Sequence, residues 1–394
     1  MQFAKKILSL LYKRLRNVLL FLYIPKKIEI LCGFCLTHYL KWDIYSTKLM
    51  HKKNASIQSI ADALGISVTT VSRVLNGVGK KYRISEKTIA TVKAMASKQN
   101  YTPNRLAKSL RLKKTSTIGL IMPDISNPWF AKIAMKIEKA SRNRGYNILL
   151  CNSNDSVDIE KNALEHLQDW MVDGIIMAPI GVEHEHIVHT QQSGTPVVLI
   201  DRYFEGINLP YVSTNDFEGA YKAAEHLIEN GHQKIVCVQG VAQTSSNKQR
   251  VGGYKKALQD AGLHLDDSHV IGHDFSFANG YAQGLHIITH LLPKGITAIF
   301  STGNQITLGL LKAFAEHNIK VPKDVSLVSY DEQNYSELLY TPLSTISHLE
   351  EEELGELALG LLFDEINGDE LSGNKKILLS TALIQRSSVK KCSE

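Results

Sequence analysis

The chain has 394 residues, of which 44% are hydrophobic and 21% are charged. This composition is typical of folded globular proteins and excludes collagen-like and fully disordered chains. The net charge of +6 is unevenly distributed, because residues 50–114 carry 14 Lys and Arg against only Asp62 and Glu86, whereas residues 115–394 have an acidic excess. A basic N-terminal part joined to an acidic remainder predicts a protein that docks one end on a polyanion.

Residues 1–49 are similar to a signal peptide only superficially. Basic residues precede an apolar run at 18–24, but this run is much shorter than the roughly 20 residues that span a membrane. No small-residue cleavage site follows it. A basic, Leu-rich helix that lies on a membrane surface is one alternative. We expect instead an untranslated or disordered extension and no membrane partner, because the segment lacks the pattern of a compact domain.

Residues 50–102 are expected to form a small all-α helix-turn-helix domain. Ser56 is a suitable N-cap for a first helix with apolar residues at helical spacing. Gly65 supplies the tight turn, since glycine has the conformational freedom that this position needs. Ser67 then caps a second helix, and a third helix is predicted at 85–99. Three helices in about 45 residues are enough for a DNA-binding headpiece.

The second helix has a polar outer face, because Val71, Val74 and Leu75 point inward. Hydroxyls, a guanidinium and an amide on one short helix suit base edges and phosphates better than bulk water. The alternative is a basic helical domain without a nucleic-acid partner, since charge alone is a common feature. The outward-facing residues are Val68, Thr69, Thr70, Ser72, Arg73 and Asn76.

Residues 115–388 show short apolar runs that alternate with amphipathic stretches. This alternation predicts parallel β-sheets covered by helices on both faces. About 275 residues are enough for two subdomains. A run with four consecutive Glu at 347–353 is expected to be the solvated start of a helix without a chemical role. The predicted strands lie at 118–122, 146–151, 174–178, 196–200, 234–238, 298–301 and 325–330, and the predicted helices at 131–144, 159–171, 220–230, 252–261 and 307–317.

Polar and aromatic residues follow several of these predicted strands. Ligands of such sheets lie outside the carboxyl ends of the strands. Carboxylates, amides and arginines offer paired hydrogen bonds to hydroxyl groups, and a flat aromatic ring packs against a sugar or base face. The candidate ligand contacts are Trp129, Phe130, Asp201, Arg202, Ser246, Arg250, Asn304 and Asp331.

Each candidate also has a purely structural alternative. Asp201 and Arg202 form a plausible ion pair at a strand end. Trp129 and its neighbour Phe130 suit a hydrophobic staple or core filler equally. Asp331 is a possible N-cap. A cation near the start of a helix gains nothing from the helix dipole, so a partner for Arg250 is expected.

The sequence resembles the lactose-repressor (LacI/GalR) family of bacterial regulators over about residues 55–388. The resemblance is most specific at Ile60-Ala61, at Val71-Ser72-Arg73-Val74-Leu75-Asn76-Gly77, and at Asn100-Tyr101-Thr102-Pro103-Asn104 with Ala107 and Leu110. It implies a helix-turn-helix headpiece at 50–102, a hinge helix or linker at 103–114, an α/β body at 115–388 and a tail at 389–394. The body is expected to have two lobes of the periplasmic-binding-protein type. Since Met50 lies where chains of this family usually begin, the resemblance also favours treating 1–49 as an untranslated extension.

The resemblance further implies which headpiece residues contact DNA. Val68 and Thr69 match positions that read bases, and Arg73 matches a further base contact. Leu110 matches a hinge residue that enters a minor-groove step when the hinge folds on DNA. The loop at 77–84 is about three residues longer than is usual, so we expect additional backbone contacts from its cations. The expected phosphate or hinge contacts are Ser67, Thr70, Ser72, Asn76, Lys80, Lys81, Arg83, Tyr101, Asn104 and Ala107.

For the body, the resemblance implies a small-molecule effector between two lobes. Arg250, Asp331 and the aromatic pair at 129–130 match the strongest effector contacts. Thr302-Gly303-Asn304-Gln305 replaces a common Asn-Asp pair, so recognition at this point departs from the family pattern.

Enzyme and metal motifs are nearly absent from the sequence. It contains no Walker-type loop, His-Glu-x-x-His or Gly-x-Ser-x-Gly. His184 and His186 have a spacing that is poor for metal binding from one helix face. Cys151 and Cys237 lie in apolar runs and indicate reduced, buried thiols, and Cys32 and Cys35 form a lone Cys-x-x-Cys. We expect no enzyme activity, no cofactor and no metal.

The function that the sequence favours is a cytoplasmic transcription regulator, with repression as the expected mode. Its expected partners are a near-palindromic double-stranded DNA operator, a second copy of the chain in a homodimer, and a small-molecule effector for which a sugar is favoured over a nucleobase. A solute-binding protein for sugar transport is the alternative, although such a protein has no use for the headpiece. An α/β enzyme that acts on a sugar or nucleotide is a second alternative.

Overall fold

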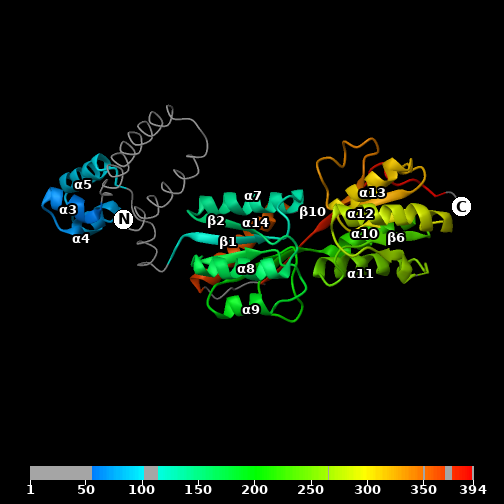
Figure 1. The fold of residues 1–394 in the computed structure, drawn as a ribbon, viewed down its shortest axis with the longest axis horizontal. Coiled ribbons are helices and arrows are strands. Elements are labelled where there is room, and N and C mark those ends of the chain that lie inside the picture. Colours follow the sequence, from blue (N-terminus) through cyan, green and yellow to red (C-terminus); the bar gives the residue numbers. More distant parts are fainter. Residues whose placement is uncertain (1–55, 102–113, 265, 349–350, 369–374, 393–394) are drawn as a thin grey trace, which may run out of the picture. The chain divides into compact units, whose positions relative to one another are not determined.

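A computed structural model describes residues 56–101, 114–264, 266–348, 351–368 and 375–392. Contacts divide the chain into two compact units, residues 1–104 and residues 105–394. The first unit is called the headpiece below and the second the body (Figure 1). The extension at 1–49, most of the expected hinge at 103–114, and Asn104, Ala107 and Leu110 lie outside the described residues.

The described part of the headpiece contains three α-helices, α3 (Ile57–Leu64), α4 (Val68–Leu75) and α5 (Glu86–Lys98), with a short 3-10 helix, η1 (Lys80–Tyr82), before α5. Ser56, Ser67 and Ser85 cap the three α-helices through their side chains. Gly65 follows α3 in the left-handed conformation, with φ of 63°. The core is small and apolar, and its buried members are Ile60, Ala61, Val71, Val74, Val92 and Ala96.

The body contains two six-stranded sheets. In the first sheet the strand order is β11-β5-β4-β3-β1-β2, and in the second it is β12-β10-β9-β8-β6-β7. All strand pairs are parallel except β10 with β12. The strands are β1 (Thr117–Met122), β2 (Asn147–Asn152), β3 (Gly174–Met177), β4 (Val197–Ile200), β5 (Tyr211–Thr214), β6 (Ile235–Val238), β7 (Val270–Ile271), β8 (Ala298–Ser301), β9 (Ser326–Tyr330), β10 (Ser344–His348), β11 (Lys376–Leu379) and β12 (Thr381–Ile384).

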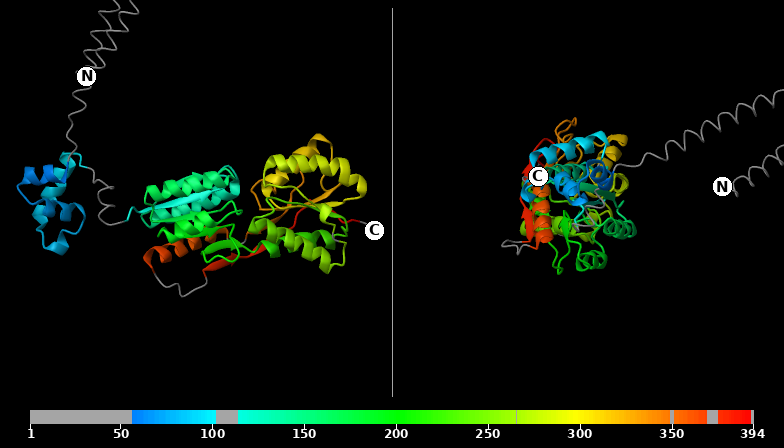
Figure 2. Two further views of the ribbon diagram at one scale, coloured as in Figure 1. Left: turned by 60° about the horizontal axis from the view of Figure 1, so that its bottom comes forward. Right: turned by 90° about the vertical axis from the view of Figure 1, so that its left-hand side faces the viewer.

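Helices cover both faces of each sheet, as the alternating sequence pattern predicts (Figure 2). Helices α7 and α14 pack on one face of the first sheet, and α8 and α9 pack on the other. The second sheet lies between the pair α10 and α11 and the pair α12 and α13. The helices of the body are α7 (Pro128–Asn143), α8 (Val157–Asp169), α9 (Glu185–Gln192), α10 (Asp216–Glu229), α11 (Ser245–Asp260), α12 (Phe277–His286), α13 (Asn304–Glu316) and α14 (Glu351–Asn367), with short turns η2 (Asp267–His269), η3 (Ile287–Leu291) and η4 (Leu292–Lys294).

The two sheets define two lobes that are not continuous in sequence. The chain passes from lobe 1 to lobe 2 between β5 and α10, returns between β10 and α14, and passes again between β11 and β12. Helix α14 therefore packs on lobe 1 although it follows most of lobe 2 in the sequence (Figure 2). Three connections between the lobes place one end of each sheet at a shared cleft.

One expectation for the body is wrong. Residues 347–353 were expected to begin a helix, but Ser347 and His348 end strand β10 and the helix begins at Glu351. The four consecutive Glu suggested a solvated segment, yet His348 is only 6% exposed. Within the described residues, no helix is both long and apolar enough to cross a bilayer.

Candidate DNA-binding surface and effector cleft

Helix α4 presents its polar face to solvent in the headpiece. Val71 and Val74 are buried against α3 and α5, so the opposite face is free. The Ser67 side chain accepts a hydrogen bond from the Thr70 backbone N–H at 3.1 Å, which fixes the start of the helix. Of the residues predicted to contact DNA, the structure leaves Ser67, Val68, Thr69, Asn76 and Arg83 exposed and Thr70, Ser72, Arg73 and Tyr101 half-buried.

The loop after α4 is folded against the helix. The guanidinium carbon of Arg73 lies over the ring of Tyr82, 3.9 Å from the ring centroid. Arg83 follows η1 in the left-handed conformation and is exposed, as are Lys80 and Lys81. Tyr101 packs against the headpiece core, and its backbone N–H donates to the Ala96 carbonyl at 2.8 Å.

The body contains a cleft of about 290 Å³ between the two lobes, at the carboxyl ends of the strands. All eight residues that the sequence predicts as ligand contacts line this cleft. Their role in binding an effector remains a prediction. The lining comprises Asp124, Ser126, Asn127, Trp129, Phe130, Asp155, Asp201, Arg202, Ser246, Arg250, Phe275, Ser276, Phe277, Gly303, Asn304, Gln305 and Asp331.

Two aspartates occupy equivalent places in the two lobes. Asp201 directly follows β4, and Asp331 directly follows β9. Both have a positive φ, 64° and 66°, which is uncommon for residues other than glycine. Such a conformation persists only where surrounding contacts hold it, and it is often found at functional sites. The chain turn at each strand end therefore aims a carboxylate at the cleft.

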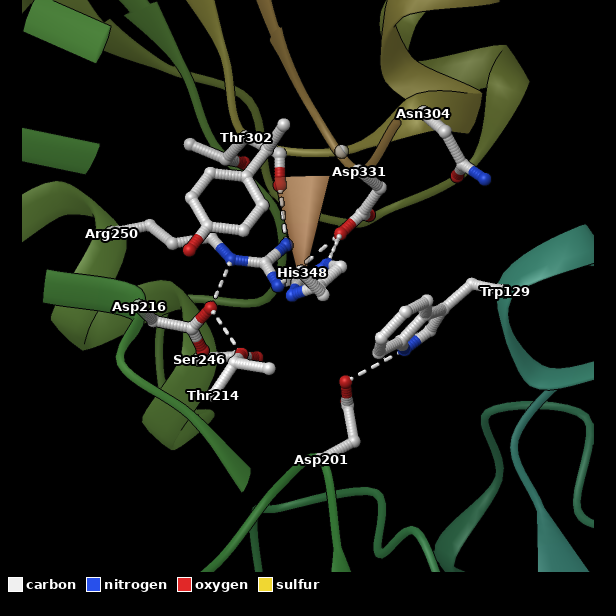
Figure 3. A network of polar contacts seen from close by, with 12 residues as sticks. Trp129, Asp201, Thr214, Asp216, Ser246, Arg250, Thr302, Asn304, Asp331 and His348 are labelled. Carbon is white, nitrogen blue, oxygen red and sulfur yellow. Dashed lines mark hydrogen bonds and ion pairs between the residues drawn. The ribbon is translucent and has the colours of Figure 1, made fainter. Parts of the chain in front are cut away.

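Arg250 is the centre of a buried ion-pair network (Figure 3). Its Nε donates to Asp216 Oδ1 at 3.1 Å, and its Nη2 lies 3.6 Å from Asp331 Oδ1. Nη1 donates to the Thr302 carbonyl at 2.7 Å, and the guanidinium carbon lies 3.8 Å from the centroid of the Tyr330 ring. The expected partner of Arg250 is therefore part of the protein itself.

A second set of contacts joins Trp129 to both lobes. The Trp129 indole N–H donates to Asp201 Oδ1 at 2.8 Å. The indole also packs against the His348 ring, with centroids 4.1 Å apart, and His348 Nε2 lies 3.1 Å from Asp331 Oδ1. Trp129 is almost fully buried, as the core-filler alternative predicts, and it also lines the cleft.

The pKa values of the two aspartates are shifted in opposite directions, because their charged neighbours differ. Burial raises the pKa of Asp201, although the nearby Arg202 and Arg250 oppose this effect. Burial also acts to raise the pKa of Asp331, but the attraction of Arg250 and the contact with His348 outweigh it, so that this pKa is lowered. Asp331 is therefore a fixed anion, whereas at Asp201 burial outweighs the attraction of Arg202, whose Nε lies 3.7 Å from Asp201 Oδ2.

Arg202 lies between two aromatic rings of the cleft. Its guanidinium carbon lies 5.9 Å from the Phe130 ring centroid and 5.4 Å from that of Phe275. Nη1 donates to the carbonyl groups of Pro179 and Ile180 at 3.3 and 3.4 Å, whereas the buried Nε makes no hydrogen bond within the described residues. Nε lies 3.7 Å from Asp201 Oδ2, which confirms the expected ion pair at the strand end. Because this contact is longer than a hydrogen bond, the Nε N–H is suited to donate to a bound molecule.

Direct hydrogen bonds already join the two lobes. The side chain of Asn304, in α13, donates to Asn127 Oδ1 at 2.9 Å. The backbone N–H of Tyr203 donates to Ser245 Oγ, at the start of α11, also at 2.9 Å. Both bonds connect a residue of lobe 1 with a residue of lobe 2.

Sequence reasoning missed about half of the cleft. Phe275, Ser276 and Phe277 lie just before and at the start of α12, a helix that was not predicted. His348 does not line the cleft but contacts two residues that do, Trp129 and Asp331. It was assigned to a solvated helix, because the polar composition of β10 gives no apolar run.

The described residues contain no group of three or more side chains that could hold a metal ion. His186 instead lies 2.7 Å from the buried Glu160, whose other carboxylate oxygen accepts the Ile180 backbone N–H at 2.8 Å. This pair stabilises the loop after β3.

Comparisons with known proteins agree with this architecture. A family model described as bacterial regulatory proteins, lacI family, matches residues 56–104. A model described as periplasmic binding proteins and sugar binding domain of LacI family matches residues 115–386. The chain belongs to the LacI family. It is therefore a DNA-binding transcription regulator with a small-molecule-binding body.

Several LacI-family relatives match most of the chain. The ribose operon repressor of Escherichia coli K12 is 30% identical over 85% of this chain and 99% of its own length. The HTH-type transcriptional regulator DegA of Bacillus subtilis is 33% identical over 74% of this chain and 86% of its own length. A LacI-family regulator from Enterococcus faecium with bound ribose is 27% identical, with a TM-score of 0.61 over 70% of this chain and all of that one. The lac repressor dimer bound to operator shares the fold, with a TM-score of 0.73 at 24% identity over 86% of this chain and all of that one.

Proposed function

We propose that this regulator represses transcription in the cytoplasm and that a sugar bound in the cleft controls its affinity for DNA. The observation that carries the sugar assignment is the lining of the cleft, where carboxylates and the Arg202 guanidinium stand beside the Phe130 and Phe275 rings. Carboxylates accept hydrogen bonds from hydroxyl groups, and aromatic rings pack against the apolar face of a sugar. The structure of the E. faecium relative with ribose supports the same assignment.

On the DNA side, we propose that the exposed face of α4 enters the major groove. Val68, Thr69 and Arg73 are the proposed base contacts, since they lie at the start and on the outer face of the helix. The remaining predicted residues contact the phosphate backbone, which positions the helix but carries no sequence information. Residues 103–114 are the proposed hinge, with Leu110 as the residue that enters the minor groove.

We further propose a homodimer that binds a near-palindromic operator. In lobe 1, Leu150 on the edge strand β2 is 47% exposed and Met135 on α7 is 63% exposed. In lobe 2, Leu338 and Tyr340 are also large, apolar and exposed. An apolar face on each lobe suits pairing with the same faces of a second copy. We propose no catalytic role for the protein.

A ligand screen on the full chain tests the effector assignment. Thermal unfolding is followed with pentoses, hexoses, disaccharides and the purines hypoxanthine and guanine, and each stabilising compound is then titrated by calorimetry. At 100 times its dissociation constant a ligand stabilises the protein by about 2.7 kcal/mol, which is readily detected. Stabilisation by a sugar that also changes DNA affinity supports the proposal, and stabilisation by a purine alone contradicts it.

A further inference from the structure

We propose that Tyr82, in the lengthened loop after α4, holds Arg73 in the orientation in which it reads a base. Tyr82 thereby sets the specificity at one base pair of each half-site. The inference rests on the proposed role of α4 as the recognition helix. The contact between the two side chains is the main observation that supports it, since the guanidinium carbon of Arg73 lies 3.9 Å from the centroid of the Tyr82 ring.

The loop that carries Tyr82 is firmly anchored. The Val78 backbone N–H donates to the Arg73 carbonyl at 3.0 Å, so the loop starts from the same turn of α4 that carries Arg73. The Ile84 N–H donates to the Gly79 carbonyl at 3.1 Å and closes the loop around η1. A side chain at Gly79 would lie 3.1 Å from Ile89 Cδ1, so this glycine permits the close packing of the loop on α5. The backbone that carries Tyr82 is therefore fixed, and its ring, which is 48% exposed, lies against Arg73.

An aromatic ring is well suited to hold an arginine that must still bind something else. A carboxylate partner would accept hydrogen bonds from the guanidinium N–H groups and so occupy them. A ring instead attracts the cation through its face and leaves those N–H donors available. Arginine reads guanine by donating two hydrogen bonds to O6 and N7, which requires a fixed guanidinium plane. Tyr82 therefore orders Arg73 before DNA is bound and keeps it competent for this contact.

The cations of the same loop have a separate role. Lys81 and Arg83 are exposed on either side of Tyr82. Cations at such positions contribute to binding through phosphate contacts, which depend on salt and not on sequence. The loop therefore makes two contributions that can be separated by mutation, specificity through Tyr82 and general affinity through its cations.

The test is a double-mutant cycle in the full chain on an operator obtained by in vitro selection. The variants are Tyr82→Ala, Tyr82→Phe, Arg73→Ala and the double variant, with Lys81→Ala as the matched control. Each is titrated against the selected operator and against operators with single base-pair changes. We expect Tyr82→Ala to lower operator affinity about two- to fivefold, as loss of an exposed cation–π contact predicts. The loss should be confined to the base pair at which Arg73→Ala also loses its preference.

The remaining variants separate a specific effect of Tyr82 from a general loss of DNA affinity. Tyr82→Phe keeps the ring and should retain the wild-type preference, and Tyr82→Ala should have no further effect when Arg73 is already alanine. Lys81→Ala should weaken binding to every sequence equally and reduce the salt dependence by about one counterion. Equal weakening on all sequences by Tyr82→Ala, or an undiminished preference in that variant, would overturn the inference while leaving α4 as the reading helix. Failure of the wild-type protein to select any sequence would overturn both.

Discussion

At the scale of single residues, the body is organised around charges that are removed from water. Arg250, Asp216 and Asp331 are each at most 7% exposed and depend on one another for compensation. A buried ion pair is costly to break, because removal of one member leaves an uncompensated charge in a medium of low polarity. The ion-pair network around Arg250 therefore also stabilises the fold of lobe 2.

We predict that Arg250→Met lowers the free energy of unfolding by about 3–5 kcal/mol, because methionine leaves two buried carboxylates without their partner. Chemical denaturation, followed through the unfolding transition of the body, measures this loss. Arg142→Met is the control, since Arg142 forms an exposed pair with Glu138 in α7 and should leave the transition unchanged. Equal stability of Arg250→Met and the wild type would show that the network contributes nothing to folding.

We also predict that effector binding releases a proton from Asp201. Burial raises the pKa of this carboxyl above its ordinary value of 3.8. A ligand hydroxyl that donates to the carboxylate favours the charged form and lowers the pKa again. Affinity should therefore increase as the pH rises from about 3.8 through the raised pKa.

Calorimetry in buffers of different ionisation enthalpy measures this proton directly. In the effector-free protein, the same carboxyl makes the folding stability depend on pH, and this stability falls as the pH rises. A raised folded-state pKa contributes stability that is present below pH 3.8 and is lost as the pH rises through the folded value. Asp201→Asn keeps the acceptor for the Trp129 indole N–H and should abolish the proton release. An unchanged proton release in that variant would assign the effect to another group.

At the scale of secondary-structure elements, the sequence signal was strongest where periodicity and caps coincide. The three headpiece helices were predicted within one or two residues, because Ser56, Ser67 and Ser85 cap them and apolar residues recur at helical spacing. Strands β1, β3, β4, β6, β8 and β9 were predicted from continuous apolar runs, which parallel strands buried on both faces require. The edge strand β2 was also predicted from such a run, although none of its residues is buried.

Elements without such a signal could not be predicted. Strand β5 has the sequence Tyr-Val-Ser-Thr and β10 has Ser-Thr-Ile-Ser-His, so neither forms an apolar run. Both lie where the chain crosses between lobes, and their identity depends on pairing with strands distant in sequence. Cleft residues that directly follow a predicted strand could be found, whereas His348 on β10, which contacts Trp129 and Asp331, could not.

The headpiece should be the less stable of the two units, because its core contains only six buried side chains among the described residues. We predict that Ile60→Ala, which removes a fully buried side chain of α3, costs about 2–5 kcal/mol. This loss is comparable with the total stability of a domain of this size. DNA binding should be abolished, as measured by fluorescence anisotropy, and effector binding by the body should be retained.

Lys93→Ala on the exposed face of α5 is the control for this experiment, since its side chain contributes nothing to the core. Full DNA affinity in Ile60→Ala would contradict the view that the small core limits the stability of the headpiece. Loss of effector binding in the same variant would show that the two units do not fold independently.

At the scale of the whole molecule, three chain crossings and a polar cleft allow the two lobes of the body to move relative to each other around a ligand. A regulator of this kind requires the ligand to favour one arrangement of the lobes, with coupling free energies of about 1–3 kcal/mol. The bond from the Tyr203 N–H to Ser245 Oγ joins the lobes but lies outside the cleft lining. It therefore affects closure without contacting the ligand.

We predict that Ser245→Ala weakens effector binding about two- to tenfold, because one hydrogen bond that favours the closed arrangement is worth about 0.5–1.5 kcal/mol. Isothermal titration calorimetry measures this change. Ser97→Ala, an exposed serine in α5, is the control and should bind the effector as the wild type does. Unaltered affinity in Ser245→Ala would mean that this bond is equally strong in the open arrangement.

Selection of genomic DNA fragments by the purified full chain, repeated with each ligand that stabilises it, tests directly whether α4 reads base edges and whether the body controls when it does so. We expect enrichment of fragments that share a near-palindromic sequence, and we expect this enrichment to be altered by the stabilising sugar and weakened in Arg73→Ala. Recovery of genomic fragments no better than random duplex, with and without ligands, would contradict this expectation.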